Sequence, residues 1–474
     1  MAERLKVVVF DDDPTGSQTV HSAPLLLRWD AGTLAAGLQH PSPLLFLLAN
    51  TRALDAAAAV ERVQAICCAL KPALEQAVAA GWIDRWLLVS RGDSTLRGHF
   101  PLEVEAIAAA FGPFDGTLLA PAFLPGGRTT VGGVHYLHGE PVHTTPFAAD
   151  RLFGYRSSDL PAWVEEKSAG RIAAEAVQRL TLAELEAARR DPAAGLAALS
   201  DRLSALEGGA VLAVDAEHPG QLEALGEAVR AVTSPAGSSA AGEAGAPPRL
   251  PRRLLFQSAA SLLNGLVPLP PQPRDAAGLA ALRRRDAAGL PLPGLVVVGS
   301  HVPLADAQLQ PLLAEPGCGG VELPVPKLAR VLEGPEPAAL LASLQRAWAA
   351  QLQQQLNAGR TPVLYSSRGE VSCRSAAERR RLGLALAALM ARLVAALEPQ
   401  LGYVISKGGI TSHTLLEQGL GAAAVELQGQ LSAGLSLVLT PPIDGRPGLP
   451  VVTFPGNLGD AGGLRQAWGL LEQG

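Results

Sequence analysis

Two loops rich in aspartate and arginine carry most of the potential chemistry in this 474-residue chain. The first, 11–17, reads Asp-Asp-Asp-Pro-Thr-Gly-Ser and follows an apolar run at 5–10. Three neighbouring carboxylates repel one another, so one of them needs a proton, a cation or a basic partner. Two roles fit: a general base for a substrate hydroxyl, and an oxygen ligand for Mg²⁺. A plain turn followed by a helix cap would use the same residue types.

The second loop, 91–98, reads Arg-Gly-Asp-Ser-Thr-Leu-Arg-Gly and follows the apolar run 86–90. Its arginines can hold a carboxylate or a phosphate through paired hydrogen bonds, and its hydroxyls can donate to the same anion. Its aspartate can orient an arginine or accept a proton. An ordinary Arg–Asp surface pair is the alternative. The candidate residues are Arg91, Asp93, Ser94, Thr95 and Arg97.

Two further polar loops follow apolar runs, Asn-Thr-Arg at 50–52 and Pro-Gly-Gly-Arg-Thr-Thr at 125–130. In the latter, Gly127 and Arg128 repeat the same chemistry. Ligands of open α/β sheets bind at the carboxyl ends of the strands. Four such loops at one sheet edge favour a site for a small polar anion. Three nearby histidines have no standard zinc spacing, and we interpret them as loop polarity; they are His135, His138 and His143.

Glycine- or serine-bearing loops follow three apolar runs in the second half, at 299–303, 406–412 and 455–460. Backbone N–H groups in such loops approach phosphates closely, and Lys407 would add a mobile positive charge. A tight turn is the alternative at any one of them. No GxxxxGK[ST] or GxGxxG pattern occurs in the required context, so neither a P-loop nor a standard dinucleotide fold is supported.

Short apolar runs alternate with longer amphipathic stretches, which predicts an α/β fold with two open domains and mainly parallel sheets. The expected domains are 1–266, with a flexible loop at 234–253, and 294–474, joined by a proline-rich linker at 267–293. An active-site cleft between domains is expected. Predicted strands are 5–10, 44–49, 86–90, 117–121, 211–215, 295–299, 321–324, 362–366, 403–406, 422–427 and 449–453. Predicted helices include 57–80, 101–111, 182–205 and 376–398.

Composition excludes several classes of protein. The formal net charge of -5 implies no basic face, so nucleic acid is not an expected partner. The four cysteines form no CxxC pair, which favours reduced thiols and a cytoplasmic location. We expect no signal peptide and no membrane-spanning segment, because no run reaches about 18 consecutive apolar residues. The oligomeric state stays open, with a homodimer as one option.

The chain resembles the four-carbon acid sugar kinase family, which includes threonate, erythronate and 3-oxo-tetronate kinases. The segments that carry the resemblance occur in order along nearly the whole chain. They are FDDDPTGSQTV (10–20), RGDSTLRGHFPLEVEA (91–106), PAFLPGGRTTVGGVHY (121–136), GSHVP (299–303), SKGGITS (406–412) and FPGNLGD (454–460).

The resemblance implies a sugar-acid-binding N-terminal domain, a nucleotide-binding C-terminal domain, and transfer of the ATP γ-phosphate, with Mg²⁺, to a hydroxyl of a short sugar acid. The implied catalytic residues are Asp12, Asp13 and Asp93, and the proton acceptor stays open among them. The implied substrate-binding residues are Thr15, Gly16, Arg91, Ser94, Thr95, Arg97, Gly127 and Arg128. The implied nucleotide-binding residues are Ser300, Ser406, Lys407, Gly408, Gly409, Ile410, Thr411 and Gly456. Many relatives carry an acidic residue where this chain has Ile410.

We hypothesise that Arg91 and Arg97 clamp the substrate carboxylate while Lys407 and the neighbouring glycine amides hold phosphates. Two other functions fit parts of the sequence. A haloacid-dehalogenase-like phosphatase would use Asp11 as nucleophile and Asp13 as acid and base. A non-catalytic sugar-acid sensor would bind the ligand without turnover.

Overall fold

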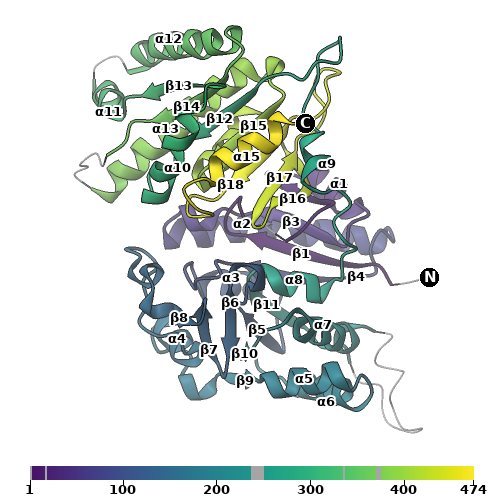
Figure 1. Ribbon diagram of the computed structural model, residues 1–474. Coiled ribbons are helices and arrows are strands. Elements are labelled where there is room, and N and C mark those ends of the chain that lie inside the picture. The colour runs from purple at the N-terminus through teal and green to yellow at the C-terminus, as the bar shows by residue number, and fades with distance from the viewer. Residues whose placement is uncertain (1–2, 17–18, 236–249, 335–336, 370–374) are drawn as a thin grey trace. The chain divides into compact units, whose positions relative to one another are not determined.

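The computed structural model describes residues 3–16, 19–235, 250–334, 337–369 and 375–474. Most of the loop expected at 234–253 lies outside these residues, as do Ser17 and Cys373. The chain divides into two compact units, Met1–Pro271 and Gln272–Gly474. Figure 1 labels their helices and strands. The predicted α/β class with mainly parallel sheets is confirmed.

The sheet of the first unit is parallel throughout its described strands. In spatial order they are β2 (Ala23–Leu26), β3 (Leu44–Leu48), β1 (Leu5–Asp11), β4 (Arg85–Arg91), β11 (Leu254–Ser258), β5 (Gly116–Ala120), β10 (Ala210–Val214) and β9 (Gln178–Leu180). Val7, Val8 and Val9 have no exposed surface. A strand buried on both faces needs apolar side chains on both, which explains the continuous apolar runs.

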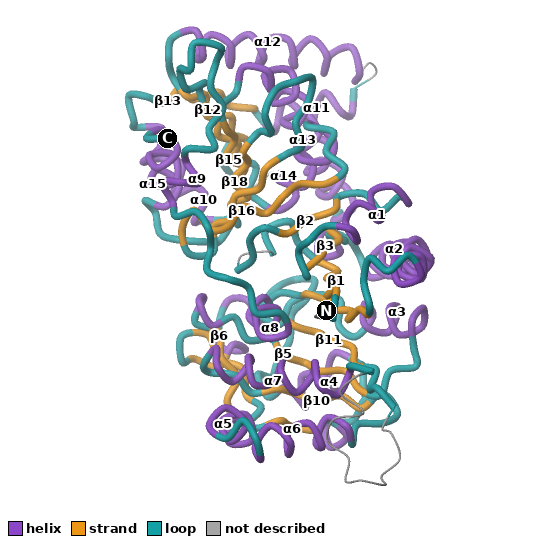
Figure 2. Tube along the Cα trace, turned by 90° about the vertical axis from the view of Figure 1, so that its right-hand side faces the viewer, coloured by secondary structure: helices purple, strands orange, loops and turns teal. Residues whose placement is uncertain are grey.

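Helices cover both faces of this sheet. Figure 2 shows α2 (Ala56–Ala79) and α3 (Leu102–Phe111) together on one face and α8 (Ala260–Leu266) on the other. Helix α2 begins where the Asp55 side chain accepts a hydrogen bond from the Ala58 N–H. Its buried stripe recurs at helical intervals and consists of Ala59, Val63, Ile66, Cys67, Leu70, Leu74 and Ala77. The unit also contains α1 (Ala31–Gln39), α4 (Leu160–Lys167) and α7 (Pro219–Thr233).

The helix predicted at 182–205 is in fact two helices, α5 (Leu182–Arg190) and α6 (Ala194–Ser204). Pro192 explains the break, because proline lacks an N–H and disfavours helical backbone at the residue before it. Asp191 accordingly leaves the helical region, with φ −122° and ψ 90°. The sequence also did not predict a small antiparallel sheet, formed by β6 (Arg128–Val131), β7 (Val134–Leu137) and β8 (Glu140–Pro141).

The sheet of the second unit is parallel over five strands and antiparallel at one edge. In spatial order the strands are β13 (Cys318–Leu323), β14 (Thr361–Ser366), β12 (Gly294–Val298), β15 (Tyr403–Lys407), β18 (Pro450–Phe454), β17 (Leu435–Leu439) and β16 (Ala424–Ser432). The accompanying helices include α9 (Ala276–Ala280), α10 (Pro303–Leu313), α11 (Val325–Glu333), α12 (Pro337–Asn357), α13 (Ala376–Leu397), α14 (Gly409–Thr414) and α15 (Gly463–Glu472).

Part of the expected linker, 272–293, falls in the second unit. It contributes α9, whose Leu279 and Ala280 are buried in that unit's hydrophobic core. The sequence predicted a linker here from its proline content and did not predict this short apolar helix.

Among the described residues, one helix, at Glu378–Gln400, is long and apolar enough to cross a membrane by length and composition. Its Leu389, Met390 and Leu393 are completely buried. A core helix passes the same test, so one such helix is weak evidence of a membrane span.

Candidate active site

Three strand ends meet beside Asp11 in the first unit. In the parallel register Asp11 lies opposite Leu48 of β3 and Arg91 of β4. Backbone hydrogen bonds extend this alignment beyond the strands: the Asp12 N–H donates to Arg91 O at 3.2 Å, and the Arg52 N–H donates to Asp12 O at 3.2 Å. The chain leaves β1 toward β2 on one side and leaves the neighbouring β4 toward β5 on the other, and such a reversal opens ligand sites in α/β sheets.

Arg52 connects the two aspartate loops. Its guanidinium lies 2.7 Å from Asp13 Oδ2, 3.2 Å from Asp93 Oδ1 and 3.8 Å from Asp12 Oδ2. The side chain is only 18% exposed, so water screens these contacts weakly. The sequence predicted a polar loop at 50–52 but assigned no role to Arg52. Its position directly after a buried strand, like that of the aspartates, was the available signal.

Arg91 is a buried partner of the first loop and not an open anion clamp. It is 5% exposed, and its Nη1 lies 3.4 Å from Asp11 Oδ1 and 3.2 Å from Asp12 Oδ1. A Cβ at Gly16 would lie 2.2 Å from Asp11 Oδ1 and 2.4 Å from Arg91 Nη1, so glycine here lets this pair lie against the loop. The expectation that Arg91 clamps the substrate carboxylate is therefore not supported, because the guanidinium is already engaged.

The loop after β4 is held from several sides. Arg97 Nε donates to Asp93 Oδ2 at 2.8 Å and to Thr95 Oγ1 at 3.1 Å. The Tyr155 hydroxyl donates to Thr95 O at 2.7 Å, and His135 Nε2 lies 2.8 Å from Ser94 O. These contacts fix the backbone of the loop, so its side chains are ordered before any ligand binds.

His135 is therefore a buried residue that holds the loop in place, and not the polar loop residue that the sequence suggested. It has no exposed surface, and its Nδ1 lies 2.9 Å from Thr130 Oγ1. Burial lowers the pKa of His135 to about 4, which keeps the imidazole neutral. No group of His, Cys, Asp or Glu suited to a metal ion occurs within the part of the chain that the structure describes.

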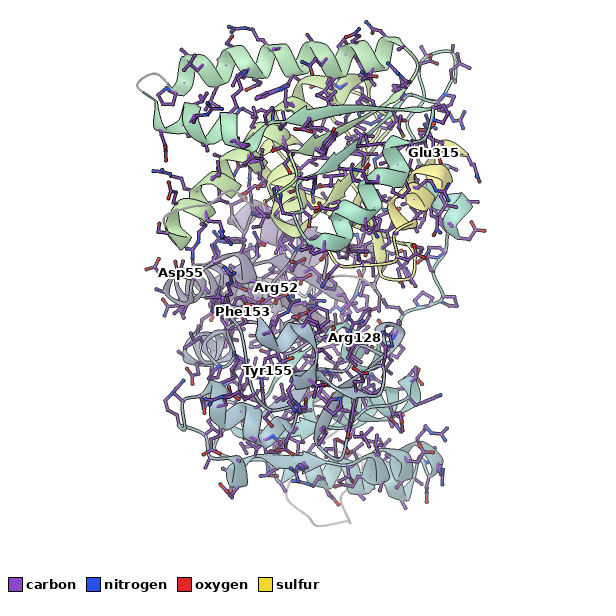
Figure 3. All side chains as sticks on the ribbon, turned by 60° about the vertical axis from the view of Figure 1, so that its left-hand side comes forward. Arg52, Asp55, Arg128, Phe153, Tyr155 and Glu315 are labelled. Atoms are coloured by element: carbon purple, nitrogen blue, oxygen red, sulfur yellow. The ribbon has the colours of Figure 1, made fainter. Side chains whose placement is uncertain are left out.

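Arg128 is the arginine best placed to meet an anion. Its guanidinium lies 5.8 Å from the centroid of the Phe123 ring, and its Nη1 donates to Gly126 O. Within the described residues it has no carboxylate in ion-pair range, and its buried Nε has no hydrogen-bond partner. Gly127, which precedes it, has φ +70°, and a side chain there would meet His138. Figure 3 labels Arg52 and Arg128 within the first unit.

The surroundings shift the pKa values of the candidate proton acceptors in different directions. Burial alone would raise the pKa of Asp93, but Arg52 and Arg97 bring it below its ordinary value. Burial is likewise outweighed at Asp13, where Arg52 and a hydrogen bond from Thr15 lower the pKa. At Asp12 burial prevails over Arg52 and Arg91, and the pKa is raised.

Asp12 is consequently the strongest candidate base. Its Oδ2 is buried and, among the described residues, accepts no hydrogen bond. Asp11 resembles Asp12 in its burial, in an Oδ2 that accepts no hydrogen bond among the described residues, and in a pKa that burial raises, here to about 7. It differs in position, because Asp11 is the last residue of β1 whereas Asp12 lies in the loop that follows. The raised pKa is unfavourable for the phosphatase hypothesis, in which Asp11 must be ionised to act as the nucleophile.

In the second unit, three loops meet at Ser300. It follows β12, which lies beside β15, and β15 lies beside β18. A Cβ added at Gly456 would lie 2.8 Å from Ser300 Oγ, and one at Gly408 would lie 3.3 Å from Ser300 Cβ. Gly408 also has φ +115°, which favours glycine. Glycine at these positions lets the loops approach Ser300 closely, and we call their meeting point the cradle, because backbone N–H groups in such loops can bind phosphates.

Lys407 does not provide the expected mobile charge. It has no exposed surface, its Nζ donates to Pro455 O at 2.9 Å, and it lies 4.1 Å from the centroid of the Phe454 ring. Burial lowers the pKa of Lys407 to about 7. The Gly408 N–H donates to Phe454 O at 2.9 Å, so it is not available to a phosphate. Both groups instead join the 406–412 loop to the loop after β18.

The remaining residues of the 406–412 loop divide by exposure. Ser406 and Ser412 are completely buried, and their Oγ atoms lie 3.0 Å apart. Thr411 is also buried and lies where a side chain at Gly299 would collide with it. Ile410 is 44% exposed, and Gly409 begins α14. Buried members of this loop shape the cradle, whereas Gly409 and Ile410 lie where a ligand can reach them.

Comparisons with known proteins also divide the chain into two domains. A sequence model of a sugar-binding N-terminal domain matches residues 7–246, and one of a nucleotide-binding C-terminal domain matches residues 295–464. A D-threonate kinase of Cupriavidus necator is 28% identical over 390 residues, which cover 81% of this chain and 80% of that protein. A D-threonate kinase of Bordetella bronchiseptica is 36% identical over 116 residues, 24% of this chain and 27% of that protein.

Two solved structures share the fold. A Salmonella typhimurium LT2 protein superposes with a TM-score of 0.63 at 18% identity, covering 98% of both chains. A Haemophilus influenzae protein superposes with a TM-score of 0.60 at 14% identity, covering 98% of this chain and 100% of that one. The fold and the paired domains define a two-unit protein with sugar-binding and nucleotide-binding parts. The chain belongs to the four-carbon acid sugar kinase family.

Proposed function

We propose that this protein is an ATP-dependent kinase that phosphorylates a hydroxyl of a four-carbon sugar acid of the threonate type. The single observation that carries this proposal is the buried Oδ2 of Asp12, which accepts no hydrogen bond from the described residues, in a site that arginines neutralise. Family membership and the similarity to D-threonate kinases support the same substrate class.

In this mechanism each part of the first unit has a separate task. Arg128, with Arg97, binds the substrate carboxylate. Asp12 accepts the proton of the attacking hydroxyl, because burial raises its pKa and one of its oxygens accepts no hydrogen bond from the described residues. Arg52 holds Asp13 and Asp93 ionised and in place, and Arg91 holds Asp11 in place.

We assign the phosphates of ATP to the cradle at Ser300, where Gly408 and Gly456 let the backbone loops come close together. ATP supplies the transferred γ-phosphoryl group. We assign no metal ligand on this chain, because Asp13 and Asp93 are already paired with arginines. Magnesium ions are commonly held by few protein ligands together with substrate phosphates, so Mg²⁺ is expected to enter with ATP.

Asp12→Asn tests the proposed base. The amide keeps the shape of the carboxylate but cannot accept the proton, so we expect kcat to fall by about 10²–10⁴-fold. Binding of the sugar acid, measured by calorimetry without nucleotide, should remain within a few-fold of the wild type. Asp84→Asn is the matched control, since Asp84 forms an exposed pair with Arg4 at 2.8 Å. An Asp12→Asn enzyme with wild-type kcat would rule out this assignment.

A further inference from the structure

A short segment at the end of β14 contacts the loop that carries Ser300, although the sequence assigned it no role. The segment is Ser-Ser-Arg at 366–368, and the loop, called here the Ser300 loop, is 299–302. The two are neighbours because β14 lies beside β12, the strand that precedes the loop. Ser366 is completely buried, and its Oγ lies 3.2 Å from His301 Nε2. The stronger contacts come from Arg368.

Arg368 holds both ends of the turn after β12 through three hydrogen bonds. Its Nη1 donates to Ser300 O at 2.7 Å and to Asp306 Oδ1 at 2.7 Å. Its Nη2 donates to Val298 O at 3.3 Å. Hydrogen bonds from a charged donor are stronger than neutral ones, so these contacts fix the loop firmly.

These bonds determine where the backbone N–H groups of the loop point. In a planar trans peptide, the N–H points away from the C=O of the preceding residue. The peptide after Val298 follows this rule, because its C=O accepts from Arg368 on the side of β14. Its N–H, on Gly299, donates to Lys407 O at 3.3 Å on the opposite side, where β15 lies.

The same rule applies to the next carbonyl that Arg368 binds. Because Ser300 O accepts from Arg368, the N–H of His301 points away from the guanidinium. Among the described residues, the N–H groups of Ser300, His301 and Val302 donate to no acceptor. Helix α10 begins directly after them, at Pro303. Unpaired N–H groups in a loop that leads into a helix can bind phosphate oxygens.

Arg368 also neutralises a carboxylate near the same loop. Asp306 lies in the first turn of α10, and its side chain is 43% exposed. An unpaired negative charge there would repel the phosphates of a nucleotide. The contact with Arg368 at 2.7 Å compensates that charge.

We infer that Arg368 is a positioning residue for nucleotide binding, because it holds the Ser300 loop in the conformation that presents its N–H groups. The inference rests on the proposed function, in which the phosphates of ATP bind at the cradle. Arg368 acts through the loop and not by touching the phosphates, since its Nη1 already binds Ser300 O and the Asp306 carboxylate.

The test is calorimetric binding of ATP with Mg²⁺ to the full chain without a sugar acid. Arg368→Met keeps an apolar stem but removes the three hydrogen bonds, so we expect ATP to bind about 10- to 100-fold more weakly. Binding of D-threonate without nucleotide should not change. In turnover assays the variant should raise the KM for ATP and leave the KM for the sugar acid unchanged. A general loss of stability does not produce that difference between the two substrates.

Arg465→Met is the matched control, because Arg465 pairs with Glu315 at 3.3 Å on the surface of the same unit and is 52% exposed. It should leave ATP binding unchanged.

Two further variants separate the position of the loop from charge. Arg368→Met leaves Asp306 unpaired, and this repulsion alone would weaken ATP binding. The double variant Arg368→Met/Asp306→Asn removes the repulsion, and we expect it still to bind ATP at least several-fold more weakly than the wild type. Ser366→Ala removes the contact with His301 at constant charge and should also weaken ATP binding several-fold. If melting curves show that Arg368→Met does not fold, Ser366→Ala decides the question.

Wild-type ATP affinity in folded Arg368→Met would overturn the positioning role, as would full recovery in the double variant. Wild-type affinity in Ser366→Ala would overturn it where Arg368→Met does not fold. The same preparations separate this inference from the proposed function. A wild-type protein that binds ATP but phosphorylates no acid refutes the proposed function, and the comparison of ATP affinities still tests Arg368. A wild-type protein that binds no ATP refutes both.

Discussion

Replacing Arg52 with methionine should destabilise the first unit by about 3–5 kcal/mol at pH 7. Arg52 lies within 3.2 Å of carboxylates on both Asp13 and Asp93. A charge pair about 4 Å apart gains about 4 kcal/mol at an effective dielectric constant of about 20, so the gross attraction is roughly 8 kcal/mol. Desolvation of the arginine offsets much of this attraction. The net loss of stability on removing one partner of a buried pair is therefore about 3–5 kcal/mol.

The stability lost in Arg52→Met should be larger at pH 7 than at pH 4. The pKa of Asp13 and that of Asp93 lie below the ordinary value of 3.8 in the folded protein. The stabilisation from Arg52 is therefore fully present above that value and disappears as pH falls below it. Without Arg52, burial should raise the pKa of Asp13 and that of Asp93. Both carboxylates then take up a proton in mild acid and no longer destabilise the variant as buried charges. The gap between wild type and Arg52→Met should be widest near pH 7 and less than half as large near pH 4.

Native-state hydrogen exchange of peptides from β1 and β4 measures the stability of the first unit directly. Arg171→Met is the matched control, because Arg171 pairs with Glu105 at 2.6 Å but both side chains are exposed, at 55% and 40%. It should cost less than about 1 kcal/mol. If Arg52→Met costs no more than this control, or costs the same at pH 4 and pH 7, the account of the buried charge cluster is wrong.

Three other predictions follow from single contacts. Burial raises the pKa of Glu103 from 4.5 to about 7, so the folded state holds a proton that the unfolded state releases in this range. First-unit stability should therefore fall by up to about 3 kcal/mol from pH 4.5 to pH 7, and hydrogen exchange should show a flatter profile in Glu103→Gln. Burial lowers the pKa of Lys407 from 10.5 to about 7, so second-unit stability should rise between these pH values, and Lys407→Met should remove the rise. Gly408→Ala forces a side chain into φ +115° beside Ser300 and should weaken ATP binding about 10-fold in calorimetry, with sugar-acid affinity unchanged.

Local patterns predicted the elements that carry the site. The apolar runs before Asp11 and Arg91 are β1 and β4, because strands buried on both faces show their character residue by residue. The loops at their ends follow from chain order alone. Pro192 also indicated a break between two helices, although the amphipathic pattern on both sides of it favoured one helix.

Long-range packing decided what could not be predicted. The role of Arg52 depends on β3 lying beside β1, and sequence order does not reveal that neighbour. The burial of Lys407 depends on Phe454 and Pro455, about fifty residues away. The sequence suggests that His135 is a polar loop residue, and only its tertiary contacts with Thr130 and Ser94 reveal its structural role. In each case the residue type suggested chemistry, and the tertiary contacts determined whether it was available.

Phosphoryl transfer by this chain is tested by ³¹P NMR of the purified full chain with ATP, Mg²⁺ and single sugar acids, including D- and L-threonate, erythronate and their 3-oxo forms. A kinase of this type gives a phosphomonoester signal and stoichiometric ADP with at least one four-carbon acid, and Asp12→Asn forms both products at least about 10²-fold more slowly. Binding of an acid without any phosphomonoester would contradict the kinase assignment and favour a sensor. Release of inorganic phosphate from a sugar-acid phosphate without ATP would favour a phosphatase instead.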